Sequence, residues 1–246
     1  MEYVPVAAPS LLPCPEGWTE VAGSEPGEPV TCDPWPGGPP VAPPVMTPCP
    51  AGWREVPATD PDGAPTCDPW PDGGRHTCAD DEAHFPGEPA RSRVGSPCPT
   101  GDWADDLQAS DVVFVRAGAP SGGDGTRGSP FSTIAEATAV ADPGTTIALG
   151  KGSYDESVRL GPGCTLWGAC VALTVVDRSV ASDSDAAIEV TGADTMVRNL
   201  LVTGQSPGLV AAGAATSLEI EDVIVAGASV RGVRVTGGAT VTAHDL

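Results

Sequence analysis

Four tryptophans near the start of the chain have the type and spacing of a sugar-binding surface. Trp18 and Trp35 recur 35 residues later as Trp53 and Trp70. An indole ring offers a large, flat apolar face on which a sugar ring can stack. The alternative is that each ring covers a neighbouring disulfide as a miniature core. The residue types are compatible with both interpretations, and carbohydrate stacking is the functional one.

A second candidate is a column of polar residues in the C-terminal half. Asn199, Asp222 and Asp245 follow one another at intervals of 23 residues. Carboxylate and amide oxygens bind calcium, so a calcium site is one interpretation of the column. The other is a column of bends in which short polar side chains satisfy the backbone. Calcium is the only cofactor that the sequence suggests.

Other titratable residues give weaker signals. A short acidic cluster fits a solvated loop better than a metal site: Asp80, Asp81, Glu82 and His84. His76 and Cys78 lack the second Cys/His pair that a zinc site needs. Lys151, the single lysine, lies in a Gly-rich turn that suits a catalytic base poorly. We therefore predict no catalytic residue.

Charge and composition exclude several classes of partner. The 246 residues carry a formal net charge of −21, which would repel nucleic acid and anionic membranes. No stretch reaches the roughly 18 apolar residues of a membrane span. Almost all of the 28 prolines precede residue 130, whereas the Val/Ile/Leu-rich part follows it, so we expect two regions of different character.

Eight cysteines indicate an oxidising compartment. We expect pairing within each repeat, Cys14–Cys32 and Cys49–Cys67, followed by Cys78–Cys98. Cys164 and Cys170 would close a small loop. Six cysteines allow 15 pairings, so this connectivity is a preference only.

The expected location is extracellular or at the cell surface. No export signal is visible, because the chain starts with an acidic residue and prolines interrupt its first apolar run. We expect the native start to lie upstream, and the C-terminal half to be the truncated first part of a longer domain.

Residues 1–105 form a repeat region rich in Pro, Gly and Cys. Residues 14–36 align without a gap to residues 49–71, and a partial third unit starts near 98–103. Proline fixes φ and removes a hydrogen-bond donor, so turns and extended segments with little regular structure are expected. Such small units need disulfides to stay folded.

Residues 111–246 show short apolar strands. We predict strands at 112–115, 146–149 and 157–160, a turn at 150–154, and a helix within 131–141 that starts with a Thr133–Glu136 capping box. The stretches 199–204 and 222–227 match each other, which is typical of stacked coils with three strands each. The fold class is therefore all-β, a parallel β-helix, with an irregular β-sandwich as the rival.

The segment from 113 to 160 resembles the start of pectin-lyase-like proteins of the DUF1565 type. The matching positions are Pro130, Phe131, Thr133, Ile134, Ala137, Gly144, Thr146, Ile147, Gly152, Tyr154 and Glu156, and Thr145 replaces the usual Asp. The resemblance implies a right-handed parallel β-helix whose first coil is covered by the helix. The whole chain also resembles long acidic surface proteins of myxobacterial type.

Three classes of function follow. The first is a non-catalytic secreted or surface protein, of structural or adhesion type, with a β-helix stalk. The second is a protein that binds a polysaccharide or another cell-wall component. The third is a polysaccharide lyase or glycosidase whose groove residues lie beyond residue 246. The sequence favours the first and leaves the oligomeric state open.

Overall fold

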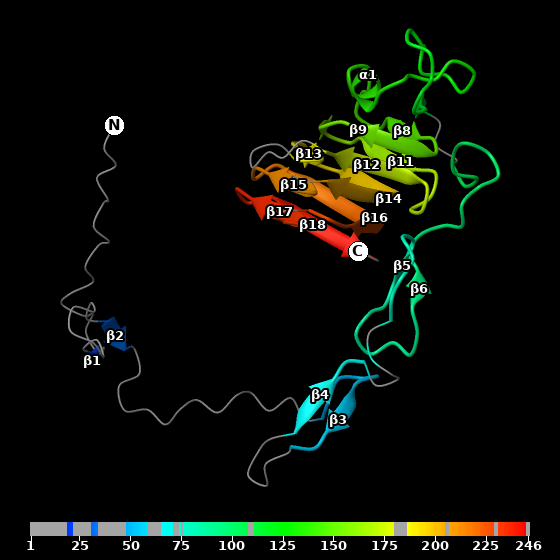
Figure 1. Cartoon of the computed structure of the whole chain (residues 1–246). Coiled ribbons are helices and arrows are strands. Elements are labelled where there is room, and N and C mark those ends of the chain that lie inside the picture. The colour runs from blue at the N-terminus through cyan, green and yellow to red at the C-terminus, as the bar shows by residue number, and fades with distance from the viewer. Residues whose placement is uncertain are drawn as a thin grey trace, which may run out of the picture. The chain divides into compact units, whose positions relative to one another are not determined.

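A computed structural model of the chain divides into two compact units, residues 1–50 with 55–67 and residues 51–54 with 68–246 (Figure 1). The structure describes the following residues: 19–21, 31–33, 48–58, 65–70, 74, 76–107, 111–179, 186–204, 207–228 and 231–244.

The repeat region contains small two-stranded sheets. β1 (Thr19–Val21) pairs antiparallel with β2 (Thr31–Asp33). The same places in the second repeat hold β3 (Arg54–Val56) and β4 (Thr66–Asp68), so the two repeats place their strands alike. A third antiparallel pair joins β5 (Glu82–Ala83) to β6 (Ser92–Arg93).

Most of the remaining chain winds into a parallel β-helix of about four coils, each with strands on three faces. Face A contains β7 (Val112–Val115), β8 (Thr146–Leu149), β11 (Thr165–Gly168), the first parts of β14 (Thr195–Gly204) and β16 (Ser217–Val225), and β18 (Thr240–His244). Face B contains β9 (Gly152–Asp155), β12 (Thr174–Arg178) and the second parts of β14 and β16. Face C contains β10 (Val158–Leu160), β13 (Ile188–Val190), β15 (Leu209–Ala212) and β17 (Val233–Thr236).

The pairings on all three faces are parallel, and the chain visits faces A, B and C in the same order in each coil. Coil 1 contains β8, β9 and β10, coil 2 contains β11, β12 and β13, coil 3 contains β14 and β15, and coil 4 contains β16 and β17. The predicted parallel β-helix is confirmed, and the β-sandwich is excluded because its strands would pair antiparallel.

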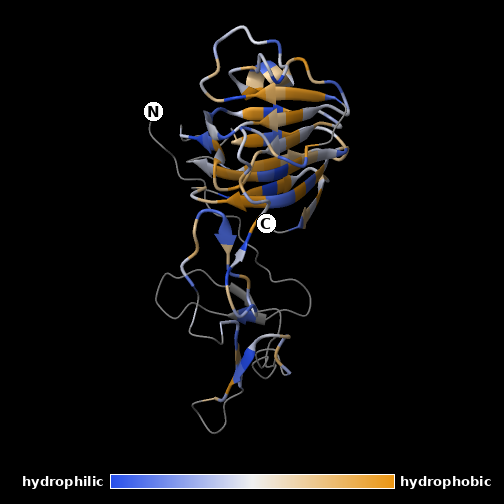
Figure 2. Ribbon diagram, turned by 90° about the vertical axis from the view of Figure 1, so that its right-hand side faces the viewer, coloured by the Kyte–Doolittle hydropathy of each residue, from blue (hydrophilic) through white to orange (hydrophobic). Residues whose placement is uncertain are grey.

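The core is a stack of like side chains. Ile147, Leu166, Val197 and Ile220 occupy one register column of face A, and all four are fully buried. Each such side chain contributes roughly 1.5–3 kcal/mol when removed from water. Figure 2 shows the hydrophobic residues gathered in the strands of the β-helix.

The helix α1 (Ile134–Thr138) lies at the start of the β-helix and contacts β7, β8 and β10 (Figure 1). The predicted capping box is present: Thr133 Oγ1 accepts from the Glu136 N–H, and Glu136 accepts from the Thr133 N–H. Ile134 and Ala137 are fully buried, so α1 covers the interior of the first coil. The helix is shorter than the segment 131–141 in which it was predicted.

One local prediction is wrong. The predicted turn at 150–154 contains the start of β9, which begins at Gly152. The small residues and Gly pattern suggested a turn, but Tyr154 is buried at 3% exposure and lies opposite Val176 in the parallel ladder. Burial of this ring and the pairing with β12 outweigh the local preference for a turn.

Candidate functional site

Asn199 and Asp222 form the bend between face A and face B in successive coils. Their φ angles are 57° and 54°, in the left-handed region that Asn and Asp tolerate better than most residues. Strand register places them at equivalent positions, because Arg198 pairs with Glu221 and Leu200 with Val223. The predicted column is therefore a column of bends. Asp245, its third predicted member, lies outside the described residues.

The side chain of Asn199 is fully occupied by backbone partners. It has no exposed surface, and its Oδ1 accepts from the Ser96 N–H at 3.0 Å. Its Nδ2 donates to the carbonyls of Gly168 at 3.1 Å and Ala169 at 3.2 Å. These bonds are those of a bend residue. Within the described residues, no group of three or more His, Cys, Asp or Glu is placed to hold a metal ion.

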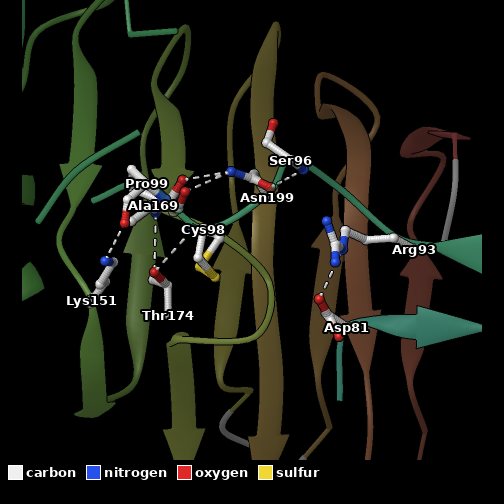
Figure 3. Close-up of a disulfide and its surroundings, with 11 residues drawn as sticks. Asp81, Arg93, Ser96, Cys98, Pro99, Lys151, Ala169, Thr174 and Asn199 are labelled. Atoms are coloured by element: carbon white, nitrogen blue, oxygen red, sulfur yellow. Dashed lines mark hydrogen bonds and ion pairs between the residues drawn. A yellow bond between two sulfur atoms is a disulfide. The ribbon is translucent and has the colours of Figure 1, made fainter. Parts of the chain in front are cut away.

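The donor to Asn199 belongs to a segment, residues 95–103, that crosses three coils along the edge between faces A and B. We call it the strap. It passes Asn199 in coil 3, is bonded by Cys98 to Cys170 in coil 2, and accepts from the Lys151 ammonium through the Pro99 carbonyl in coil 1 (Figure 3). The strap is the candidate functional site, because it joins the chain that precedes the β-helix to the interior of the fold.

Two residues of the strap allow it to pack closely against the β-helix. Gly95 has a φ of +78°, and a Cβ there would lie 2.5 Å from the Asn199 Oδ1, so only glycine allows this close approach. At the other end, Trp103 is buried and its Nε1 donates to the Val115 carbonyl at 3.3 Å. Its ring meets the Phe114 ring edge-on at a centroid distance of 5.1 Å.

The disulfides agree with the predicted pairing only in part. Cys49 and Cys67 are bonded, as expected for pairing within a repeat. Cys98 is bonded to Cys170, so the predicted pairs Cys78–Cys98 and Cys164–Cys170 are wrong. The physical reason is the path of the strap, which crosses the bend that carries Cys170, 72 residues further along the chain. Of the predicted pair Cys14–Cys32, Cys14 lies outside the described residues.

Cys78 and Cys164 are free thiols. Cys164 is buried at the start of coil 2, and this burial raises the pKa of its thiol, with a further contribution from the Asp142 carboxylate. A thiol with a raised pKa is a weak nucleophile. Its position therefore fits a packing role.

Trp53 and Trp70 are partly exposed and pack against the chain. The Trp70 ring lies 4.7 Å from the His84 ring, centroid to centroid. A Cβ at Gly87 would lie 2.9 Å from the Trp53 Cδ1, so the indole covers the backbone there. Neither contact excludes stacking on a sugar, and that prediction stays open. Trp18 and Trp35 lie outside the described residues.

The acidic cluster around residue 81 is tied to neighbouring arginines. Asp81 pairs with Arg93 at 3.2 Å, and Glu82 pairs with Arg91 at 3.0 Å. His84 uses both ring nitrogens: Nδ1 accepts from the His76 N–H, and Nε2 donates to the Glu88 carbonyl. These bonds are structural, and they leave the imidazole with no free nitrogen for a metal.

The sequence interpretation missed an outward row on face A. The Arg198 guanidinium lies 4.1 Å from the centroid of the Trp167 ring and pairs with Glu221 at 3.4 Å. These residues hold equivalent positions in coils 2, 3 and 4. Arg198 and Glu221 are 23 residues apart, so the period of the coils carried a signal for this pair, whereas Trp167 lies 31 residues before Arg198 and carried none.

No family model, curated protein or solved structure matches this chain. The β-helix is therefore established by the chain's own strand pairing. Among the described residues, none of the helices has the length and hydrophobicity that crossing a membrane would take.

Proposed function

We propose that this chain is a non-catalytic structural or adhesion-type protein of the bacterial cell surface or exterior, with the β-helix as its stalk. The observation that best supports this proposal is the Cys98–Cys170 disulfide, which joins the strap directly to coil 2. This bond and Cys49–Cys67 suit an oxidising compartment outside the cytosol.

The position of the Cys98–Cys170 bond determines how the stalk carries tension. A force applied through the repeat region reaches Cys98 first and passes through the disulfide to Cys170. The 72-residue span between them, which includes α1 and coil 1, then lies outside the path of the force. An arrangement that shields the cap of the β-helix from tension suits a stalk.

The motif that resembles the DUF1565 type supports the same conclusion. Thr133 caps α1, and the Glu156 carboxylate accepts from the N–H groups of Ile134 and Ala135. The Tyr154 hydroxyl donates to the Gly150 carbonyl at 2.8 Å. Of these motif residues, Glu156 joins the cap to coil 1, while Thr133 orders the cap and Tyr154 orders coil 1. We therefore propose that the pectin-lyase-like resemblance reflects a shared scaffold.

Pulling the full chain from its two ends in an optical trap tests the stalk. The chain with intact disulfides should release about 240 Å less length on complete unfolding than the Cys98→Ser/Cys170→Ser variant, at about 3.4 Å for each of 72 residues. The Cys49→Ser/Cys67→Ser variant is the matched control, with a smaller gain of about 60 Å for its 18 residues. Equal lengths for the wild type and the first variant would exclude the proposed force path.

Location and chemistry are tested separately. In intact cells that make the protein, an externally applied antibody should reach it, whereas a cytosolic marker stays unlabelled. Release of new sugar ends from polygalacturonate or other cell-wall glycans by the purified chain would contradict the non-catalytic assignment. Labelling only after lysis would contradict the surface assignment.

A further inference from the structure

A shallow groove of about 380 Å³ runs along the outer side of face A, across coils 2 to 4 and β18. It is distinct from the strap and from the tryptophans of the repeat region. Its lining includes hydroxyl, carboxylate and thioether side chains, notably Thr165, Asp194, Met196, Ser217, Glu219 and Thr242.

Strand register orders these side chains. Thr165 pairs with Met196, Met196 with Glu219, and Glu219 with Thr242, so the four form one outward row perpendicular to the strands. Adjacent strands lie about 4.8 Å apart, which makes the row about 14 Å long. The groove is therefore suited to an extended chain lying along the axis of the β-helix.

The two carboxylates of the groove are not used by the fold. Neither Asp194 nor Glu219 has a side-chain hydrogen bond or ion pair with another described residue. Two other acids on the outer side of the β-helix do have partners: Glu189 pairs with Arg159, and Glu221 with Arg198. Unpaired carboxylates beside a groove remain available as hydrogen-bond acceptors for a ligand.

The backbone forms a bend at the edge of the groove. Asp194 has a φ of 55°, although it is not glycine, and its N–H donates to the Ser217 Oγ at 2.7 Å. Asp tolerates this left-handed region better than most residues, as it does at Asp222, so the conformation is that of a bend. The hydrogen bond to the next coil fixes the backbone that carries this carboxylate.

We propose that the groove binds a linear carbohydrate that carries protonated amino groups, such as a glucosamine oligomer. Threonine and serine hydroxyls exchange hydrogen bonds with sugar hydroxyls, and Met196 offers an apolar surface to a ring face. Asp194 and Glu219 complement the ammonium groups, and no cationic side chain is among the described lining residues. A net charge of −21 repels anionic polymers. This binding does not depend on the stalk role.

The test is calorimetric titration of the full chain, at mildly acidic pH, with three oligomers of equal length. These are glucosamine, fully N-acetylated glucosamine and galacturonate oligomers. We expect the glucosamine oligomer to bind, the acetylated one to bind at least about tenfold more weakly, and the galacturonate oligomer not to bind. Equal binding of the first two, or no binding of the first, would overturn the proposal.

Matched variants separate the groove from the general attraction of an acidic protein for a cation. Asp194→Asn/Glu219→Gln should weaken glucosamine-oligomer binding about tenfold or more. Two exposed acids outside the groove, Glu55 and Asp105, provide the control, because Glu55→Gln/Asp105→Asn gives the same net charge. This control should bind like the wild type, and an equal loss in both variants would overturn the site.

A third variant blocks the groove by charge. Thr242→Lys places a cation on the exposed strand β18, in the same outward row as Glu219. It should abolish binding of the glucosamine oligomer while the circular dichroism spectrum stays unchanged. Undiminished binding with an unchanged spectrum would place the oligomer elsewhere on the chain and overturn the proposal.

Discussion

The Ser96 N–H donates to the Asn199 Oδ1 at 3.0 Å, across 103 residues of sequence. The side-chain amide of Asn199 also donates, through its Nδ2, to the Gly168 and Ala169 carbonyls of the preceding coil. One buried side chain thus joins the strap to two successive coils. Because every polar atom of the Asn199 amide is paired, its removal would take a hydrogen-bond partner from three backbone groups.

We expect Asn199→Ala to lower the free energy of unfolding of the β-helix by about 3 kcal/mol. About 1 kcal/mol comes from placing alanine in the left-handed region, and the rest from unpaired buried backbone groups. Urea unfolding followed by far-UV circular dichroism measures the change.

Asp222→Ala is the control for this variant, because Asp222 has a similar φ and no hydrogen bond of its side chain with another described residue. Its expected cost is only about 1 kcal/mol. Similar losses in the two variants would show that the bonds to Asn199 add no stability.

Loss of the strap disulfide should destabilise the β-helix. For Cys98→Ser/Cys170→Ser we expect a loss of about 4 kcal/mol, the chain-entropy value for a loop of 72 residues. The midpoint of chemical unfolding under non-reducing conditions measures it. Cys49→Ser/Cys67→Ser should leave the β-helix transition in place, since that bond closes a loop within the repeat.

Peptide mapping without reduction tests the connectivity itself. A peptide that links Cys98 to Cys170 is expected, together with alkylation of Cys78 and Cys164 in the unfolded chain. Recovery of a Cys78–Cys98 peptide as the main species would contradict the structure.

Tyr154 should make stability depend on alkaline pH. Burial raises the pKa of its hydroxyl from 10.0 to about 12. Because the unfolded chain ionises first, the contribution of Tyr154 is complete below pH 10 and is lost as the pH rises towards 12. Between pH 8 and pH 11 the wild type should lose about 1.4 kcal/mol through this residue.

Tyr154→Phe removes that dependence and also the bond to the Gly150 carbonyl, so it should be less stable by about 1 kcal/mol at pH 8. The difference between the two proteins should then close near pH 11, because all other groups titrate alike in both. A constant difference across this range in urea titrations would disprove the assignment.

Glu156 should stabilise the start of α1. Glu156→Ala removes the acceptor of the Ile134 and Ala135 N–H groups, with an expected loss of about 1–2 kcal/mol. Hydrogen exchange at these two amides should speed up, whereas exchange in coil 3 should not change. Unaltered protection at both amides would show that another group caps the helix.

The period of the apolar residues favoured the β-helix over the rival β-sandwich, because inward side chains such as Val197 and Ile220 must match from coil to coil. The capping box at Thr133 could also be predicted from the sequence, since its two bonds connect residues only three positions apart. Both features depend on residues at short or regular intervals, and both were predicted correctly, whereas the turn at 150–154 was not, because burial of Tyr154 outweighs the local preference.

The strap was not predictable in the same way. Its bonds connect residues such as Cys98 and Cys170, whose neighbourhood depends on how the bend of coil 2 is placed. Pairing within the two repeats left Cys78 and Cys98 as the remaining cysteines of that region, which favoured a bond between them. Likewise, the groove of face A depends on the register that brings Met196 beside Glu219, and no single stretch of sequence displays it.

The strap disulfide also determines the order in which the coils must fold and the cysteines must be oxidised. At the proposed location outside the cytosol, Cys98 enters the oxidising compartment before Cys170, and the two thiols lie side by side only after coil 2 has formed. Until then Cys98 is a free thiol with Cys78, 20 residues away, as a competing partner. Folding of this chain therefore requires that oxidation be slower than winding of the first two coils, or that an isomerase correct early bonds.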